Sequence, residues 1–140
     1  SLDDIALADT AFEASGDSPS ELFQAASLAL IEAMVAPGTV NSAWSQIFEK
    51  TDPDLPTLLF DWLSEIVYLK DAQGLVFREV LTTVVQDPAT GTWKLDATLI
   101  GEEIDLHKHE LRGDVKAVTK HMYDVHEQDG RWTARVVLDV

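Results

Sequence analysis

The stretch Lys116-Ala117-Val118-Thr119-Lys120-His121 is followed, after Asp129-Gly130, by Trp132-Thr133-Ala134-Arg135-Val136-Val137-Leu138-Asp139-Val140. Apolar residues alternate with polar ones in both segments, as in half-buried strands, and the Asp-Gly pair between them is a hairpin signal. We therefore expect an antiparallel hairpin at the end of this sequence. It brings together the Asp139 carboxylate and the main-chain carboxylate of Val140, which repel each other unless a cation or a donor neutralises them.

The alternation places a set of residues on one face of the first of these strands: Val115, Ala117, Thr119, His121, Tyr123 and Val125. On that face His121 is expected to be a hydrogen-bonded core histidine rather than a catalyst. Further strands are expected over residues 76–86 and 93–99, joined by the five-residue loop Asp87–Gly91, and over the shorter segments 5–15 and 42–50.

Two helices are marked by their start and stop signals. Ser18-Pro19-Ser20-Glu21 is a capping box with proline at the first helical position, and Pro37-Gly38 stops the segment that follows. Asp54 can cap a second helix, which Gly74 ends. The order β-α-β-α-β-β-β-β predicts an α+β fold, a mostly antiparallel β-sheet sandwich with two amphipathic helices packed on it.

Composition limits the function. The 140 residues fit a single domain, 1–140, and carry a formal charge of −15 with a pI near 4.3. Such a charge disfavours strong direct nucleic-acid binding. The absence of cysteine excludes disulfides, thiolate zinc sites and cysteine nucleophiles. No apolar run could span a bilayer and no signal peptide is evident, so a cytoplasmic protein without membrane attachment is expected. The nearest basic patch is interrupted by acidic residues and is interpreted as a solvated surface: Lys108, Arg112, Lys116 and Lys120.

Asp9 is the third acidic group of interest, because it interrupts the apolar segment 5–12. An unpaired buried carboxylate is costly, so Asp9 either faces solvent or meets a partner. If the first strand lies beside the last, Asp9, Asp139 and the carboxylate of Val140 converge. Hard oxygen ligands without sulfur suit Ca²⁺ or Mg²⁺. The alternative is that these carboxylates are separate and exposed.

Elsewhere the signals for enzyme chemistry are weak. The sequence has no P-loop, GxGxxG, GxSxG or HExxH motif. His107-Lys108-His109-Glu110 could offer two imidazoles and a carboxylate to a transition metal, but a solvated polar loop is the simpler interpretation.

Several motifs spread over nearly the whole chain match one known family. They are Glu13-Ala14-x-Gly16, Leu58-Leu59-x-x-Trp62-Leu63-x-Glu65, Gly101-Glu102 with Asp105, His109-Glu110-Leu111, Lys116-Ala117-Val118-Thr119-x-His121, and Trp132-x-Ala134-Arg135-Val136-Val137-x-Asp139-Val140. On these residues the chain resembles the archeases. The last two motifs are the most specific.

The resemblance implies a function and a site. Archeases are small cytoplasmic α+β proteins that activate the GTP-dependent RtcB-type RNA ligase by promoting its guanylylation and turnover in tRNA splicing or RNA repair. The family's metal site maps onto Asp9, Asp139 and Val140, with Ca²⁺ expected and Mg²⁺ as the alternative. Its functional lysine maps onto Lys116. We therefore expect a non-enzymatic activator whose partner is the ligase, contacted by a set of three side chains: Lys116, His109 and His121.

The chain also departs from the family pattern. Ala6 and Leu7 stand where the family has His-Thr before the aspartate, and Lys120 replaces a tyrosine. An altered activity is one consequence to consider. Two other functions stay open: a metal-dependent hydrolase that uses the same carboxylates to activate water, and a general chaperone, which would need an exposed apolar patch.

Overall fold

The computed structural model describes the backbone of residues 9–140 and the side chains from Thr10 onward. Its elements follow the expected order: β1 (Asp9–Gly16), α2 (Pro19–Met34), the 3₁₀ turn η1 (Pro37–Thr39), β2 (Trp44–Asp52), α3 (Leu55–Gln73), β3 (Leu75–Gln86), β4 (Trp93–Glu103), β5 (Ala117–Gln128) and β6 (Arg131–Asp139). The α+β class is confirmed.

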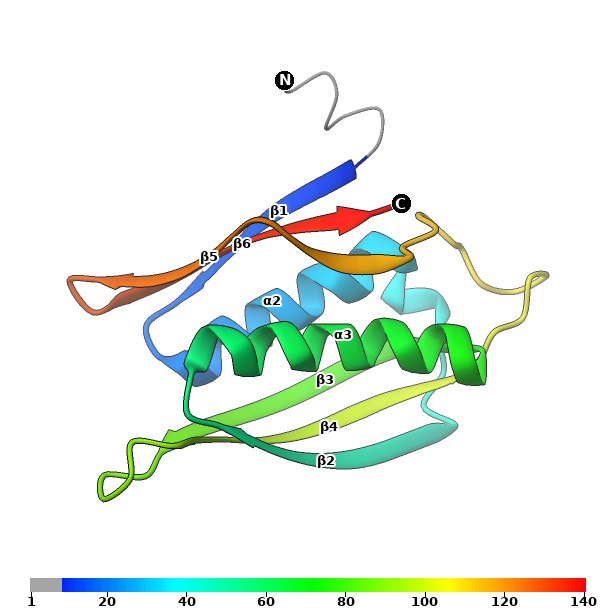
Figure 1. Cartoon of the computed structure of the whole chain (residues 1–140). Coiled ribbons are helices and arrows are strands. Elements are labelled where there is room, and N and C mark those ends of the chain that lie inside the picture. Colours follow the sequence, from blue (N-terminus) through cyan, green and yellow to red (C-terminus); the bar gives the residue numbers. More distant parts are fainter. Residues whose placement is uncertain (1–8) are drawn as a thin grey trace.

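The strands form two three-stranded antiparallel sheets, ordered β1-β6-β5 and β2-β4-β3. Figure 1 shows both helices lying between the two sheets, and α2 and α3 each contact strands of both. Each helix therefore buries apolar side chains toward two layers. Neither helix of the described chain is both long and apolar enough to cross a bilayer.

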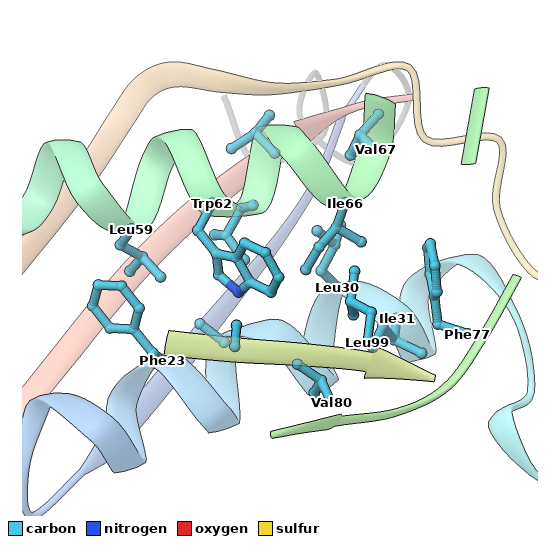
Figure 2. Packing of buried hydrophobic residues seen from close by; sticks show 14 of the residues in the cluster. Phe23, Leu30, Ile31, Leu59, Trp62, Ile66, Val67, Phe77, Val80 and Leu99 are labelled. Atoms are coloured by element: carbon cyan, nitrogen blue, oxygen red, sulfur yellow. The ribbon is translucent and has the colours of Figure 1, made fainter. Parts of the chain in front are cut away.

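The core joins the two helices to the inner faces of both sheets. Trp62 of α3 is fully buried among side chains from α2 and α3, as Figure 2 shows. Its ring meets that of Phe48 edge-on at 5.3 Å, and its indole N–H donates to Ser27 Oγ of α2 at 2.9 Å. The two helices are therefore joined by a buried hydrogen bond as well as by apolar contacts.

The helix ends confirm the sequence signals. Ser18 Oγ accepts a hydrogen bond from the Glu21 N–H, and Asp54 Oδ2 accepts one from the Thr57 N–H. Each bond satisfies one of the amides that a helix start leaves free. Gly74 ends α3 with φ 61°, a left-handed conformation that glycine adopts without strain.

Gly101 of the family-like motif has a packing reason. A Cβ placed there would clash with the carbonyl oxygen of Val76 on the neighbouring strand. At this point β3 has a bulge between Phe77 and Glu79, which brings its backbone against β4. Only glycine leaves room for that approach.

Two sequence predictions about strands need correction. The β3–β4 loop has six residues, Asp87–Thr92, because Gln86 still pairs with Trp93. The predicted face of β5 is also wrong. The register passes from Thr119, opposite Val137, to Asp124, opposite Arg135, so the alternation is interrupted. His121 is consequently exposed and is not a core histidine.

Candidate functional site

The centre of interest is the end of the β1-β6-β5 sheet that carries Asp139. In the register Asp139 of β6 lies opposite Asp9 of β1 and opposite Ala117 of β5. Residues directly opposite in an antiparallel pair are close neighbours, and two like charges in such a pair are destabilising. The condition on which the predicted carboxylate cluster depends, that the first strand lies beside the last, is therefore met at the level of the backbone. Asp139 and Val140 are both exposed.

Lys116 adjoins this end. Its backbone N–H donates to the Asp139 carbonyl oxygen at 2.8 Å, which ties the start of β5 to the end of β6. Lys116 is exposed and borders a groove of about 430 Å³ between α3 and β5. The α3 side of that groove includes Tyr68, which is 60% exposed. A lysine, a large aromatic and the Asp139 end thus share one part of the surface.

The metal ligands predicted from the sequence remain a prediction. Among residues whose side chains are described, no three His, Asp or Glu groups gather in a way that could hold a metal. Asp9 lies outside that set, as do Ala6 and Leu7, where the chain departs from the archease pattern. The donor types nevertheless fit a hard cation, because carboxylate oxygens are the ligands that Ca²⁺ and Mg²⁺ prefer.

His109 has a structural position rather than an exposed one. Its imidazole is fully buried, with Nδ1 accepting from the Asp105 N–H at 2.8 Å and Nε2 within 3.0 Å of Glu102 Oε2. This pattern places the ring proton on Nε2, where it donates to the carboxylate. His109 therefore closes the connection between β4 and β5. With both its nitrogens occupied, it does not form a transition-metal pair with exposed His107.

Glu102 accepts several of the hydrogen bonds that hold this connection between β4 and β5. Its carboxylate accepts from Lys108 Nζ at 2.8 Å, from the Asn41 N–H and from His109. These donors, with the Lys108 ammonium first, lower the pKa of Glu102 from 4.5 to about 2. The motif Gly101-Glu102, with Asp105 and His109, is thus explained by folding of the loop.

The side chains of three of the four basic residues considered as a patch have separate partners. Lys108 pairs with Glu102, Arg112 donates to the Glu32 carbonyl oxygen, and Lys120 Nζ lies 3.8 Å from the centre of the Phe60 ring. Only Lys116 borders the α3–β5 groove. This dispersal agrees with the interpretation of these residues as a solvated surface.

Two features of this surface were missed by sequence reasoning. The first is Tyr68, which follows Ser64 by four residues on the face of α3 opposite its apolar stripe. A large aromatic on an otherwise polar helix face is a signal that could have found it. The second is the irregular segment 120–123 of β5, for which the sequence offers no glycine or other cue.

Comparison with known proteins identifies the family. The model of the Archease protein family matches residues 2–140. The chain belongs to the archease family. Proteins named archease are 37% identical over 133 residues in Methanothermobacter thermautotrophicus and 34% identical over 134 residues in Pyrococcus abyssi. In both cases the match covers 95% of this chain and 93% of the relative.

Solved structures agree with the fold. The solution structure of a Methanobacterium thermoautotrophicum protein is similar to this chain with a TM-score of 0.78 and 36% identity, covering 94% of this chain and 92% of the other. The crystal structure of a Thermotoga maritima protein described as "an archease, possible chaperone" has a TM-score of 0.57 at 21% identity, with 94% and 90% covered. The second likeness shows the fold alone.

Proposed function

We propose that this protein is a non-enzymatic activator of a GTP-dependent RtcB-type 3′-phosphate RNA ligase, promoting its guanylylation and turnover in tRNA splicing or RNA repair. Membership of the archease family is the observation that carries the proposal. The ligase would be its partner. The protein would then act in the cytoplasm, where archeases work with this ligase. The acidic composition fits an activator that leaves RNA handling to the ligase, because a net charge of −15 repels phosphate.

The working surface we propose is the Asp139 end of the β1-β6-β5 sheet. Asp9, Asp139 and the main-chain carboxylate of Val140 would hold a divalent cation, Ca²⁺ or alternatively Mg²⁺. The register supports this assignment, since it sets Asp9 opposite Asp139, where two negative charges need neutralising. A bound cation would supply positive charge and fix the orientation of these carboxylates.

Lys116 is the side chain of this end that we propose contacts the ligase. It is exposed, it borders the α3–β5 groove, and its backbone is held to Asp139. His121 is also exposed and lies on β5, which begins directly after Lys116, so it is retained as a contact. The burial of His109 instead supports an indirect role, in which it positions the β4–β5 connection that leads to Lys116.

The activator would work by differential binding. A protein that binds the guanylylation-competent conformation of the ligase more tightly than other conformations raises its population. A preference of about 1.4 kcal/mol corresponds to a tenfold shift. No nucleophile or cofactor loop of this chain is needed for such an effect.

The test uses purified protein and the ligase of the same organism, with radiolabelled GTP and more RNA substrate than ligase. The proposal predicts faster ligase guanylylation and multiple turnovers only when the protein is added. Equal rates with and without it would contradict the proposal. Hydrolysis of a phosphoester by the isolated protein, in the absence of ligase, would favour the hydrolase instead.

A general chaperone is the second candidate, favoured by two exposed apolar residues of the β2-β4-β3 sheet. Ile47 and Leu81, which are 78% and 58% exposed, lie on either side of Thr98 in the register. Exposed apolar surface can bind unfolded chains. Suppression of the aggregation of an unrelated heated protein, lost in Ile47→Lys, would support this function. If adding the wild-type protein left the aggregation rate of the heated protein unchanged, the chaperone function would be excluded.

A further inference from the structure

The segment Lys120–Tyr123 is an unusually large bulge in an edge strand. Between the pairs Thr119–Val137 and Asp124–Arg135, four residues of β5 stand against the single residue Val136 of β6. An ordinary bulge inserts one extra residue. Among the described residues 9–140, β5 is paired with β6 alone, so its other side is an edge of the described sheet. Figure 1 shows β5 bending midway along its length, where it departs from a straight course beside β6.

The two ends of the bulge are anchored. Lys120 Nζ lies 3.8 Å from the Phe60 ring centre, a cation–π distance. Tyr123 donates its hydroxyl hydrogen bond to the Pro56 carbonyl oxygen at 2.6 Å and meets the Phe60 ring edge-on at 5.4 Å. The first turns of α3 therefore hold both ends. The bulge is thus held to α3 by contacts within the chain itself.

Between these anchors, two side chains face solvent. His121 is exposed, and Met122 is 48% exposed. Methionine is a flexible apolar side chain that adapts to irregular pockets and is frequent at binding surfaces. The anchors thus present an apolar side chain and an imidazole on the edge of the sheet.

Met122 also has a strained backbone. Its φ is 53°, in the left-handed region that non-glycine residues rarely adopt. The other such residue within 9–140 is Asp129, with φ 54°, followed by Gly130 with φ 78°. That pair forms the β5–β6 turn, and positive φ at both central residues is the geometry that a tight hairpin requires. No turn accounts for Met122, where glycine or asparagine would relieve the strain.

The bulge adjoins the proposed working end. Met122 follows Ala117, the register partner of Asp139, by five residues. At ~3.3 Å per strand residue, the two are at most ~17 Å apart along β5. One interface of ordinary size, burying ~800 Å² on each partner, is wide enough to cover both.

We propose that the bulge Lys120–Tyr123 is a second contact element for the ligase, in which Met122 enters an apolar pocket of the ligase while the Asp139 end is engaged. This inference rests on the proposed function and adds a specific partner-binding residue to it. The strain at Met122 is retained because the side chain serves the interface. The anchors on Phe60 and Pro56 keep the bulge preformed, so little order has to be gained on binding.

The experiment measures the Kd for the purified ligase, the stimulation of guanylylation and the melting temperature of four proteins. They are the wild type, Met122→Gly, Met122→Leu and the matched control Asp129→Gly. Met122→Gly removes the side chain and relieves the strain, whereas Asp129→Gly relieves an equivalent φ at the turn. Met122→Leu keeps an apolar side chain at the same strained position.

For Met122→Gly we expect a melting temperature at or above that of the wild type and a Kd about tenfold weaker, the effect of truncating an anchoring side chain. Met122→Leu should keep most of the wild-type affinity for the ligase, and Asp129→Gly should bind the ligase like the wild type. Wild-type affinity in Met122→Gly, or an equal loss in Asp129→Gly, would overturn the inference and leave the proposed function standing. A wild-type protein that neither binds nor stimulates the ligase would overturn both.

Discussion

Replacing Ser27 by alanine tests the packing of the two helices, because it removes the acceptor of a buried hydrogen bond. Ser27 and Trp62 are both 0% exposed, and the Trp62 Nε1 to Ser27 Oγ distance is 2.9 Å. The Ser27 hydroxyl in turn donates to the Phe23 carbonyl oxygen at 2.5 Å. In Ser27→Ala the indole N–H is left without a partner among apolar side chains, where an unmet donor costs about 1–3 kcal/mol.

That free energy translates into a measurable melting shift. The entropy of a globular protein rises by about 2.1 cal/mol/K per residue on unfolding. A loss of about 2 kcal/mol should therefore lower the melting temperature of this 140-residue chain by about 7 °C. Ser45→Ala on β2, at an exposed position, is the matched control and should change stability by less than about 0.5 kcal/mol.

A double-mutant cycle isolates the hydrogen bond. Trp62→Phe removes the indole donor, so the Ser27→Ala change should cost less in a Trp62→Phe background than in the wild type. We expect a coupling of about 1–2 kcal/mol between the two sites, measured by urea unfolding monitored by circular dichroism. A coupling of zero, or equal costs for Ser27→Ala and Ser45→Ala, would refute the reasoning.

Two further predictions concern charge. The pKa of Glu102 is lowered to about 2, so its contribution to folding stability is complete above the ordinary value of 4.5 and is lost as the pH falls toward 2. The difference in urea midpoint between the wild type and Glu102→Gln should therefore be constant above pH 5 and shrink between pH 4.5 and 2. A pH-independent difference would contradict the lowered pKa. Calorimetric titration with Ca²⁺ should show weaker binding for Asp139→Ala than for the wild type, whereas equal affinities would remove Asp139 from the proposed metal site.

Local signals in the sequence predicted much of this fold. Ser18 and Asp54 cap their helices and Gly74 ends the second one, because capping depends on residues within a few positions of each other. The hairpin turn at Asp129-Gly130 was equally local. Beyond the two hairpins, which strands pair within each sheet of the sandwich was not predicted, since a pairing such as that of β2 with β4 joins segments far apart in the sequence.

The candidate site was predicted less completely. The opposition of Asp9 and Asp139 depends on the first and last strands being neighbours, which the sequence left as a condition and which the backbone register meets. The burial of two histidines is the reverse of what the sequence predicted. His109, expected in a solvated loop, is buried, and His121, expected in the core, is exposed on the bulge of β5. Neither event has a local signal, because the first depends on Glu102 and the second on anchors in α3.

The measurement that tests the central claim most directly is stimulation of ligase guanylylation by charge-removing variants. Asp139→Asn and Asp9→Asn each remove one carboxylate from the proposed working end, and Asp96→Asn removes an exposed one from the β2-β4-β3 sheet. All three should fold like the wild type. The account predicts that Asp139→Asn and Asp9→Asn lose most of the stimulation while Asp96→Asn keeps it. Full stimulation by Asp139→Asn and Asp9→Asn would contradict the claim that the carboxylate end is the working surface.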